Sequence, residues 1–136
     1  MITKIRINEI TVKRPEDAKN AGFDVLFNVE GIKVNGAEVI INYAYAASYK
    51  GNGGIIQIKG IITANEDEKT IKAIETEMKN NKLPPEYMQN IINTINYFGT
   101  SNATVIASIV GMPAPIRMPK LALGQKETDA TKAKKK

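Results

Sequence analysis

The sequence contains no cysteine, no histidine and no tryptophan. Without cysteine the chain can form neither disulfides nor thiolate metal sites. Without histidine it lacks the commonest general base and the commonest metal ligand. Catalysis by aspartate, glutamate, lysine, serine or tyrosine stays open, but the composition argues against an enzyme. We therefore expect no catalytic residue, no metal site and no cofactor.

Long apolar runs are also missing, so no segment approaches the roughly eighteen residues that a membrane span needs. The first ten residues, MITKIRINEI, alternate instead of forming the apolar block of a signal peptide. We expect a cytoplasmic protein with no membrane span.

The net charge is +5, and the last eleven residues, KETDATKAKKK, contribute five lysines and two acids to it. The remainder, with 14 basic and 12 acidic residues, is nearly neutral. The 136 residues fit one domain, which we place at 1–125, with a disordered lysine-rich tail at 126–136. A lysine-only tail without interleaved aromatics gives little sequence readout, which argues against a nucleic-acid binder.

Period-two alternation predicts four strands, over residues 2–14, 23–30, 37–49 and 55–63. In the first strand, the alternation of apolar residues changes phase near Asn8 and Glu9, which indicates a β-bulge. Asn35-Gly36 lies between the second and third strands and is a strong hairpin signal.

Two helices follow the strands. Apolar residues Ile71, Ile74 and Met78 recur at helical spacing after a cap at Asn65 or Asp67. Pro85 starts a second helix that we expect to run through Gly99 to Ile109. Its apolar stripe is predicted to comprise Ile91, Ile95, Phe98, Val105 and Ile109. The acidic run 66–68 could suggest a metal site, but its place at a helix start favours a cap.

Strands followed by helices indicate an α+β fold, a four-stranded antiparallel sheet with helices packed on one face. The third strand is apolar on both faces, with Tyr43 and Tyr45 on one and Ile40 and Ala44 on the other. Helices on one face cannot cover both sets, so the second face is expected to meet another subunit. The sequence thus predicts a homo-oligomer.

The stretch IVGMPAPIRMPKL, residues 109–121, contains three of the six prolines, and a core helix cannot hold three prolines. It is either an extended strap that forms one wall of an apolar groove or a plug for the core. The candidate polypeptide-binding residues are Met112, Pro113, Ile116 and Met118, together with Tyr43, Tyr45 and Tyr49. Tyrosine and methionine suit adaptable apolar contacts, but we favour core packing for the strap residues and core or subunit packing for the tyrosines.

The order of elements resembles the SecB family of export chaperones over roughly residues 3–121. The resemblance is in ITVKRP, in AEVIINYAYAASYKGNGGIIQIKGI, in LPPEYMQNIINTI and in the proline stretch MPAPIRMPKL. It implies a SecB-like subunit that assembles as a dimer of dimers, has no catalytic residues and holds unfolded polypeptides on apolar grooves.

Two functions follow from this resemblance. One is an ATP-independent chaperone, or holdase, that binds non-native polypeptides in connection with protein export. The alternative is a SecB-fold adaptor with one dedicated protein partner, such as a toxin–antitoxin chaperone. Family members dock on the SecA ATPase partly through their acidity, so the near-neutral body and basic tail of this chain argue against SecA docking.

Overall fold

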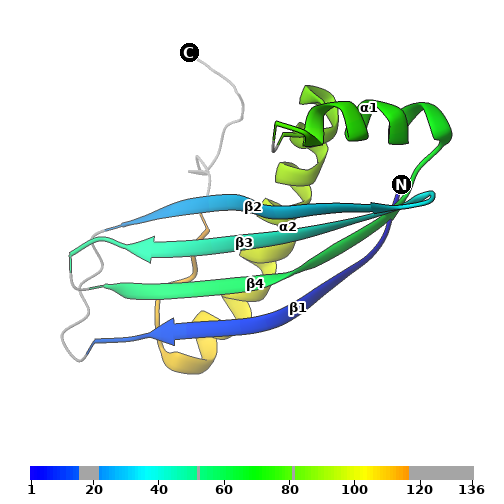
Figure 1. Ribbon diagram of the computed structural model, residues 1–136. Helices are drawn as coiled ribbons and strands as arrows, with labels where there is room; N and C mark the ends of the chain where they lie inside the picture. The colour runs from blue at the N-terminus through cyan, green and yellow to red at the C-terminus, as the bar shows by residue number, and fades with distance from the viewer. Residues whose placement is uncertain (16–21, 52, 81, 117–136) are drawn as a thin grey trace, which may run out of the picture.

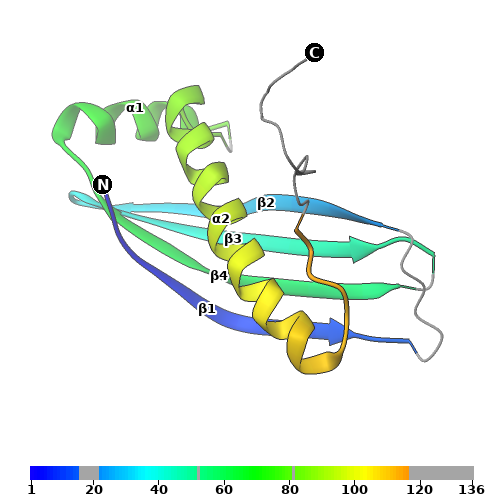
Figure 2. The ribbon, with the colours of Figure 1, turned by 180° about the vertical axis from the view of Figure 1, so that it is seen from behind.

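The computed structural model describes residues 1–15, 22–51, 53–80 and 82–116. Four antiparallel strands form one sheet: β1 (Ile2–Lys13), β2 (Phe23–Asn35), β3 (Glu38–Tyr49) and β4 (Gly54–Asn65). Two helices follow, α1 (Glu68–Met78) and α2 (Pro85–Val110). The predicted α+β class is confirmed. Helix α2 crosses one face of the sheet, and α1 lies beyond the β2 edge (Figures 1 and 2) and buries Ile71 and Ile74 in the same core. The predicted tail, residues 126–136, lies outside the described residues.

The strand order is β1-β4-β3-β2, so β2 and β1 are the two edges of the sheet. Strands β2, β3 and β4 form a meander of adjacent hairpins, whereas β1 pairs with β4. The bulge predicted near Asn8 is confirmed, because the β1–β4 register shifts between Ile7 and Glu9. The Asn35-Gly36 signal also marks a hairpin, but its two-residue loop is Gly36 and Ala37, since Asn35 still pairs with Glu38.

Antiparallel alternation divides the sheet into two faces as the sequence predicted. The face beneath the helices carries the core, with Ile41, Ile58, Ile62, Tyr43 and Tyr45 fully buried. The opposite face has no cover from the described part of the chain. It carries half-buried Ile40 and Ile61 among charged neighbours.

Gly60 permits an unusually close approach between β1, β4 and β3. A Cβ atom at this position would lie 1.8 Å from the backbone oxygen of Arg6 and 2.7 Å from the Tyr43 hydroxyl. Tyr43 is the direct cross-strand neighbour of Gly60, and its hydroxyl donates a hydrogen bond of 3.2 Å to the Arg6 oxygen. An aromatic ring laid over a strand glycine in this way compensates for the missing side chain. One tyrosine thus joins three strands.

The predicted start of α1 is confirmed in detail. The Asp67 carboxylate caps the helix by accepting a 2.8 Å hydrogen bond from the Thr70 backbone N–H. That hydrogen bond lowers the pKa of the Asp67 carboxyl. Beside it, Glu66 accepts a 2.9 Å hydrogen bond from the Tyr87 hydroxyl. The acidic run therefore caps α1 and fixes the first turn of α2.

Helix α2 is continuous through Gly99 and starts at Pro85, as the sequence predicted. Its predicted apolar stripe is wrong in the second half, because Val105 and Ile109 are 58% and 77% exposed. The buried positions are instead spaced by four: Ile91, Ile95, Gly99, Ala103 and Ala107.

This spacing has a physical cause. Four residues advance a helix by about 40° beyond one full turn, so the buried ridge winds by about 160° from Ile91 to Ala107. A helix that lies diagonally across strands buries such a ridge, and Figure 2 shows α2 in that orientation. A stripe of fixed phase, as we assumed from the sequence, would require a helix that keeps one side to the sheet.

No helix in the described part of the chain is long and apolar enough to cross a membrane.

Candidate functional site

The three predicted tyrosines lie on the helix-covered face of β3, at alternate positions. Tyr45 packs directly under α2, where a Cβ at Gly99 would lie 2.4 Å from its ring. Its hydroxyl is 3.1 Å from the Thr100 hydroxyl. The Tyr49 hydroxyl donates a 2.5 Å hydrogen bond to the Pro113 carbonyl. Tyr45 and Tyr49 therefore connect the sheet to elements that cover it, whereas the Tyr43 hydroxyl bonds within the sheet, to Arg6.

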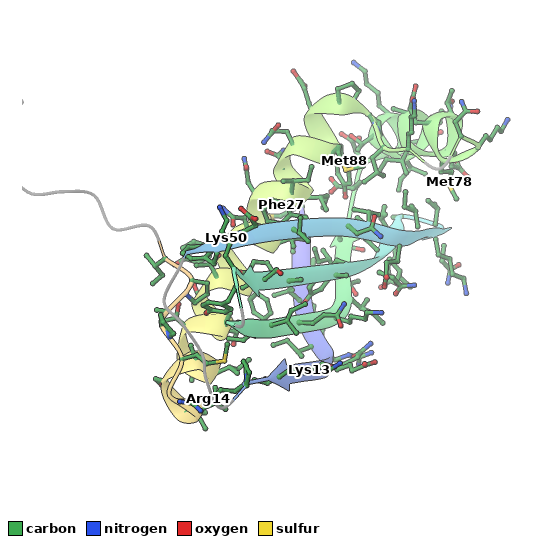
Figure 3. All side chains as sticks on the ribbon, turned by 90° about the vertical axis from the view of Figure 1, so that its left-hand side faces the viewer. Lys13, Arg14, Phe27, Lys50, Met78 and Met88 are labelled. Carbon is green, nitrogen blue, oxygen red and sulfur yellow. The ribbon has the colours of Figure 1, made fainter. Side chains whose placement is uncertain are left out.

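Burial places these rings in the core. Tyr43 and Tyr45 are fully buried, and only 7% of Tyr49 is exposed. Tyr49 also borders a shallow hollow of about 590 Å³ that is lined by Lys13 and Arg14 as well. Figure 3 labels these two basic side chains. The three tyrosines thus pack in the core of the chain, and their contact with a polypeptide stays a prediction.

Burial also predicts a loss of stability at alkaline pH. It raises the pKa of the Tyr43 hydroxyl from 10.0 to about 12 and raises the pKa of Tyr45 and Tyr49 as well. The raised pKa of Tyr43 alone contributes about 2 to 3 kcal/mol to the free energy of unfolding, because each unit of pKa difference between the folded and unfolded chain corresponds to about 1.4 kcal/mol. This contribution is fully present below pH 10 and is lost as the pH rises towards 12, because the unfolded chain releases the proton first.

We expect the urea midpoint to fall between pH 10 and 12 and to fall less steeply in Tyr43→Phe. Tyr97→Phe, in a ring that is 78% exposed, serves as the control and should follow the wild type. Identical profiles for all three proteins would contradict the prediction.

Of the predicted strap, residues 109–121, Ile109 and Val110 are the last residues of α2, and residues 112–116 are extended and cross the sheet beside α2 (Figure 2). Met112 is 6% exposed and belongs to the core, whereas Ile116 is 41% exposed. Pro113 is exposed and contributes its carbonyl to Tyr49. Met118 lies outside the described residues. Within the described strap, Met112 thus packs in the core, whereas Ile116 lies partly exposed at the surface.

Single serine substitutions in the strap should separate these two roles. Met112→Ser is expected to lower the free energy of unfolding by about 2 to 4 kcal/mol, because a buried side chain is truncated. Ile116→Ser should cost less than about 1 kcal/mol, since its side chain is partly exposed. Urea denaturation of both variants checks this, and equal midpoints would refute the division of roles.

An apolar groove lies between β2 and the first half of α2. It encloses about 290 Å³ and is lined by Phe27, Asn28, Val29, Met88, Ile92 and Ile95. Phe27 is 39% exposed, so its ring forms an accessible wall, and its other side packs on Tyr45 with ring centroids 6.3 Å apart. Figure 3 shows Phe27 and Met88 on the same side of β2. The methionine adds an unbranched side chain that adapts to different apolar contacts.

Sequence reasoning missed this groove, although it predicted the strand over residues 23–30 that carries Phe27 and Val29. The missing information was that β2 is an edge strand. On an edge strand, a side chain of the covered face can be exposed to solvent. On a central strand such as β3, a side chain of the same face is buried, as Tyr45 is.

A second accessible apolar surface is the outer ridge of α2, which we define as Tyr97, Ser101, Val105 and Ile109. These residues repeat every four positions, opposite the buried ridge. Tyr97, Val105 and Ile109 are 78%, 58% and 77% exposed. Exposed large apolar side chains that cluster on one ridge mark an interaction surface.

No family model matches this sequence, and no curated protein matches it at the level of sequence. Among solved structures, it is similar to the SecB-like chaperone Rv1957 of Mycobacterium tuberculosis, in complex with a ChAD peptide from the Rv1956 HigA1 antitoxin. The TM-score is 0.53, the sequence identity is 11%, and the match covers 92% of both chains. The chain has a SecB-like fold. At this identity the SecB-like similarity establishes architecture alone, and it confirms the fold that the family resemblance implied.

Proposed function

We propose that this protein binds extended apolar segments of other polypeptides in the groove between β2 and α2, without a nucleotide and without a catalytic step. The observation that carries the proposal is the groove itself, a cavity of about 290 Å³ whose accessible wall is Phe27. Ligand sites are concave and mostly apolar, and this groove has both properties. The solved SecB-like chaperone with its bound antitoxin peptide supports the same kind of ligand.

Two versions of this function differ in the range of ligands. A general holdase would bind many non-native polypeptides, and a role in protein export with a cytoplasmic location would follow. An adaptor would bind one dedicated partner, and the antitoxin peptide in the neighbouring structure favours this version as much as the first. A panel of unrelated unfolded proteins separates them. A holdase suppresses the aggregation of most of the panel, and an adaptor of none.

A single substitution tests the groove. Phe27→Ser should reduce the affinity for an unfolded or peptide ligand by about tenfold, because it removes most of one apolar wall. Ile10→Ser is the matched control, since Ile10 is 49% exposed on the same face of the sheet but at the other edge. Fluorescence anisotropy with a labelled apolar peptide measures both, and urea midpoints verify folding. Equal affinities of the two folded variants would refute the groove.

The protein is further proposed to assemble with copies of itself. The uncovered sheet face is the feature from which the sequence predicted a homo-oligomer, and the outer ridge of α2 adds a second surface. Homo-oligomers are built from self-complementary patches, for which an exposed apolar helix ridge is well suited.

A further inference from the structure

The two edges of the sheet differ in how well they are protected against pairing with another strand. Edge β1 has two register shifts and carries Lys4, Arg6, Glu9 and Lys13 at positions that face the uncovered side. Bulges and charges, lysine above all, are the features by which proteins prevent pairing at sheet edges. Edge β1 is therefore blunted along its length.

Between Asp24 and Val29, edge β2 has no bulge and only one charged residue, Asp24 itself. Its register with β3 is unbroken through this segment and shifts only between Val29 and Gly31. The segment contains no lysine, arginine or proline. No strand among the described residues pairs with its outer side. Its outward backbone N–H and C=O groups thus form a straight, available ladder about 20 Å long, at about 3.3 Å per residue.

Apolar exposure on this segment occurs on both faces of the sheet. Leu26 is 58% exposed on the uncovered face, and its chain neighbour Phe27 is 39% exposed on the groove face. A ligand lying only in the groove would leave Leu26 exposed. A strand added beside β2 would cover both, because its side chains alternate between the two faces.

We propose that the bound polypeptide adds to β2 as a fifth strand along Asp24–Val29, an inference that rests on the proposed function. One set of its side chains would enter the groove against Phe27 and Met88, and the alternate set would cover Leu26. Backbone hydrogen bonds supply affinity in such strand addition, and the alternating side chains supply selectivity. The ligand is an extended segment of another protein, about six residues long, apolar and free of proline at the pairing positions.

Charge further defines this ligand. Asp24 is exposed on the same face as Leu26, two residues away, and takes part in none of the ion pairs among the described residues. By contrast, Glu30 on that face pairs with Lys59 at 3.7 Å. An unpaired carboxylate beside an apolar edge favours a lysine or arginine in the added strand.

Backbone methylation of the ligand tests strand addition directly. The probe is a fluorescein-labelled ten-residue peptide of alternating valine and threonine with one lysine at each end, so that a lysine lies near Asp24 in either strand direction. Two further peptides carry N-methyl groups on one or the other alternate set of residues. Only one set directs its N–H groups to β2.

We expect one methylated peptide to bind at least tenfold more weakly than the unmodified probe and the other to retain its affinity within threefold. Equal affinities of the two methylated peptides would overturn strand addition and leave groove binding intact. No binding of the unmodified probe would overturn the proposed function as well.

Charge reversal provides an independent test on the protein. Asp24→Lys should weaken the lysine-ended probe by about threefold to tenfold and strengthen a glutamate-ended peptide of the same core. Glu9→Lys on β1 faces the same side at the other edge and should change neither affinity. Identical behaviour of the two variants would overturn the placement of the added strand beside Asp24.

A second copy of the chain is the competing occupant of this edge. Leu26→Lys would then reduce the oligomeric mass measured by light scattering, which overturns the proposal. An unchanged mass with weakened probe binding supports it.

Discussion

Replacing Gly60 by alanine is expected to destabilise the protein by at least about 3 kcal/mol, a large part of the 5 to 15 kcal/mol typical of a domain. The added methyl group would lie 1.8 Å from the Arg6 oxygen, which is backbone and cannot rotate away. Relief requires β1 to separate from β4, which breaks the hydrogen bond from Tyr43 to Arg6 and part of the strand ladder. Urea denaturation measures the change as a lower midpoint.

Gly36→Ala is the matched control for this substitution. Gly36 lies in the β2–β3 loop with a φ of 65°, but no atom lies within 4 Å of its added Cβ. Alanine there costs only the strain of the left-handed backbone, about 1 kcal/mol. Similar midpoints for the two variants would show that the sheet adapts at Gly60 and that the close approach of the three strands is not required.

Lysine at two positions of the outer ridge should convert the protein into monomers. If the ridge is the contact between copies, Val105→Lys combined with Ile109→Lys places two charges in an apolar interface, where unpaired charge is strongly unfavourable. The wild type is expected at two or four times the 14.9 kDa of one chain, and the double variant at 14.9 kDa. Light scattering at micromolar concentration measures both masses.

The same variant separates assembly from folding. Both side chains are exposed in one chain, at 58% and 77%, so the helix and its core contacts stay intact. Circular dichroism should therefore be unchanged while the mass falls. A wild type that is monomeric across this range would refute self-assembly, and an oligomeric double variant would exclude the ridge as the contact.

The sequence predicted the sheet well because side-chain alternation in a strand is a local property. Tyr43, Tyr45 and Ile41 share the buried face because they are separated by two, whatever the rest of the fold does. The Asp67 cap and the Pro85 helix start were predictable for the same reason, since each depends on a few neighbouring residues.

The features that the sequence did not predict depend on how segments distant in the chain are arranged in space. Consecutive strands usually lie side by side, yet β1 pairs with β4, and this pairing leaves β2 at the edge. The groove at Phe27 and the exposure of Leu26 follow from that placement and not from their local pattern. The burial of Val105 and Ile109 was wrongly predicted because the diagonal path of α2 is likewise invisible in the sequence.

Pairing of β1 with β4 also has a consequence for how the chain reaches its native state. The β2–β3–β4 meander can form from hairpins between adjacent segments, but Lys13 must find Ile55 and Ile5 must find Ile62. Closing contacts between such distant segments carries a larger entropy cost and is slower than hairpin formation. During synthesis β1 emerges first and has no partner until β4 follows. Until β1 pairs, β4 is therefore an additional open edge of the meander, and two unfinished chains would join incorrectly there.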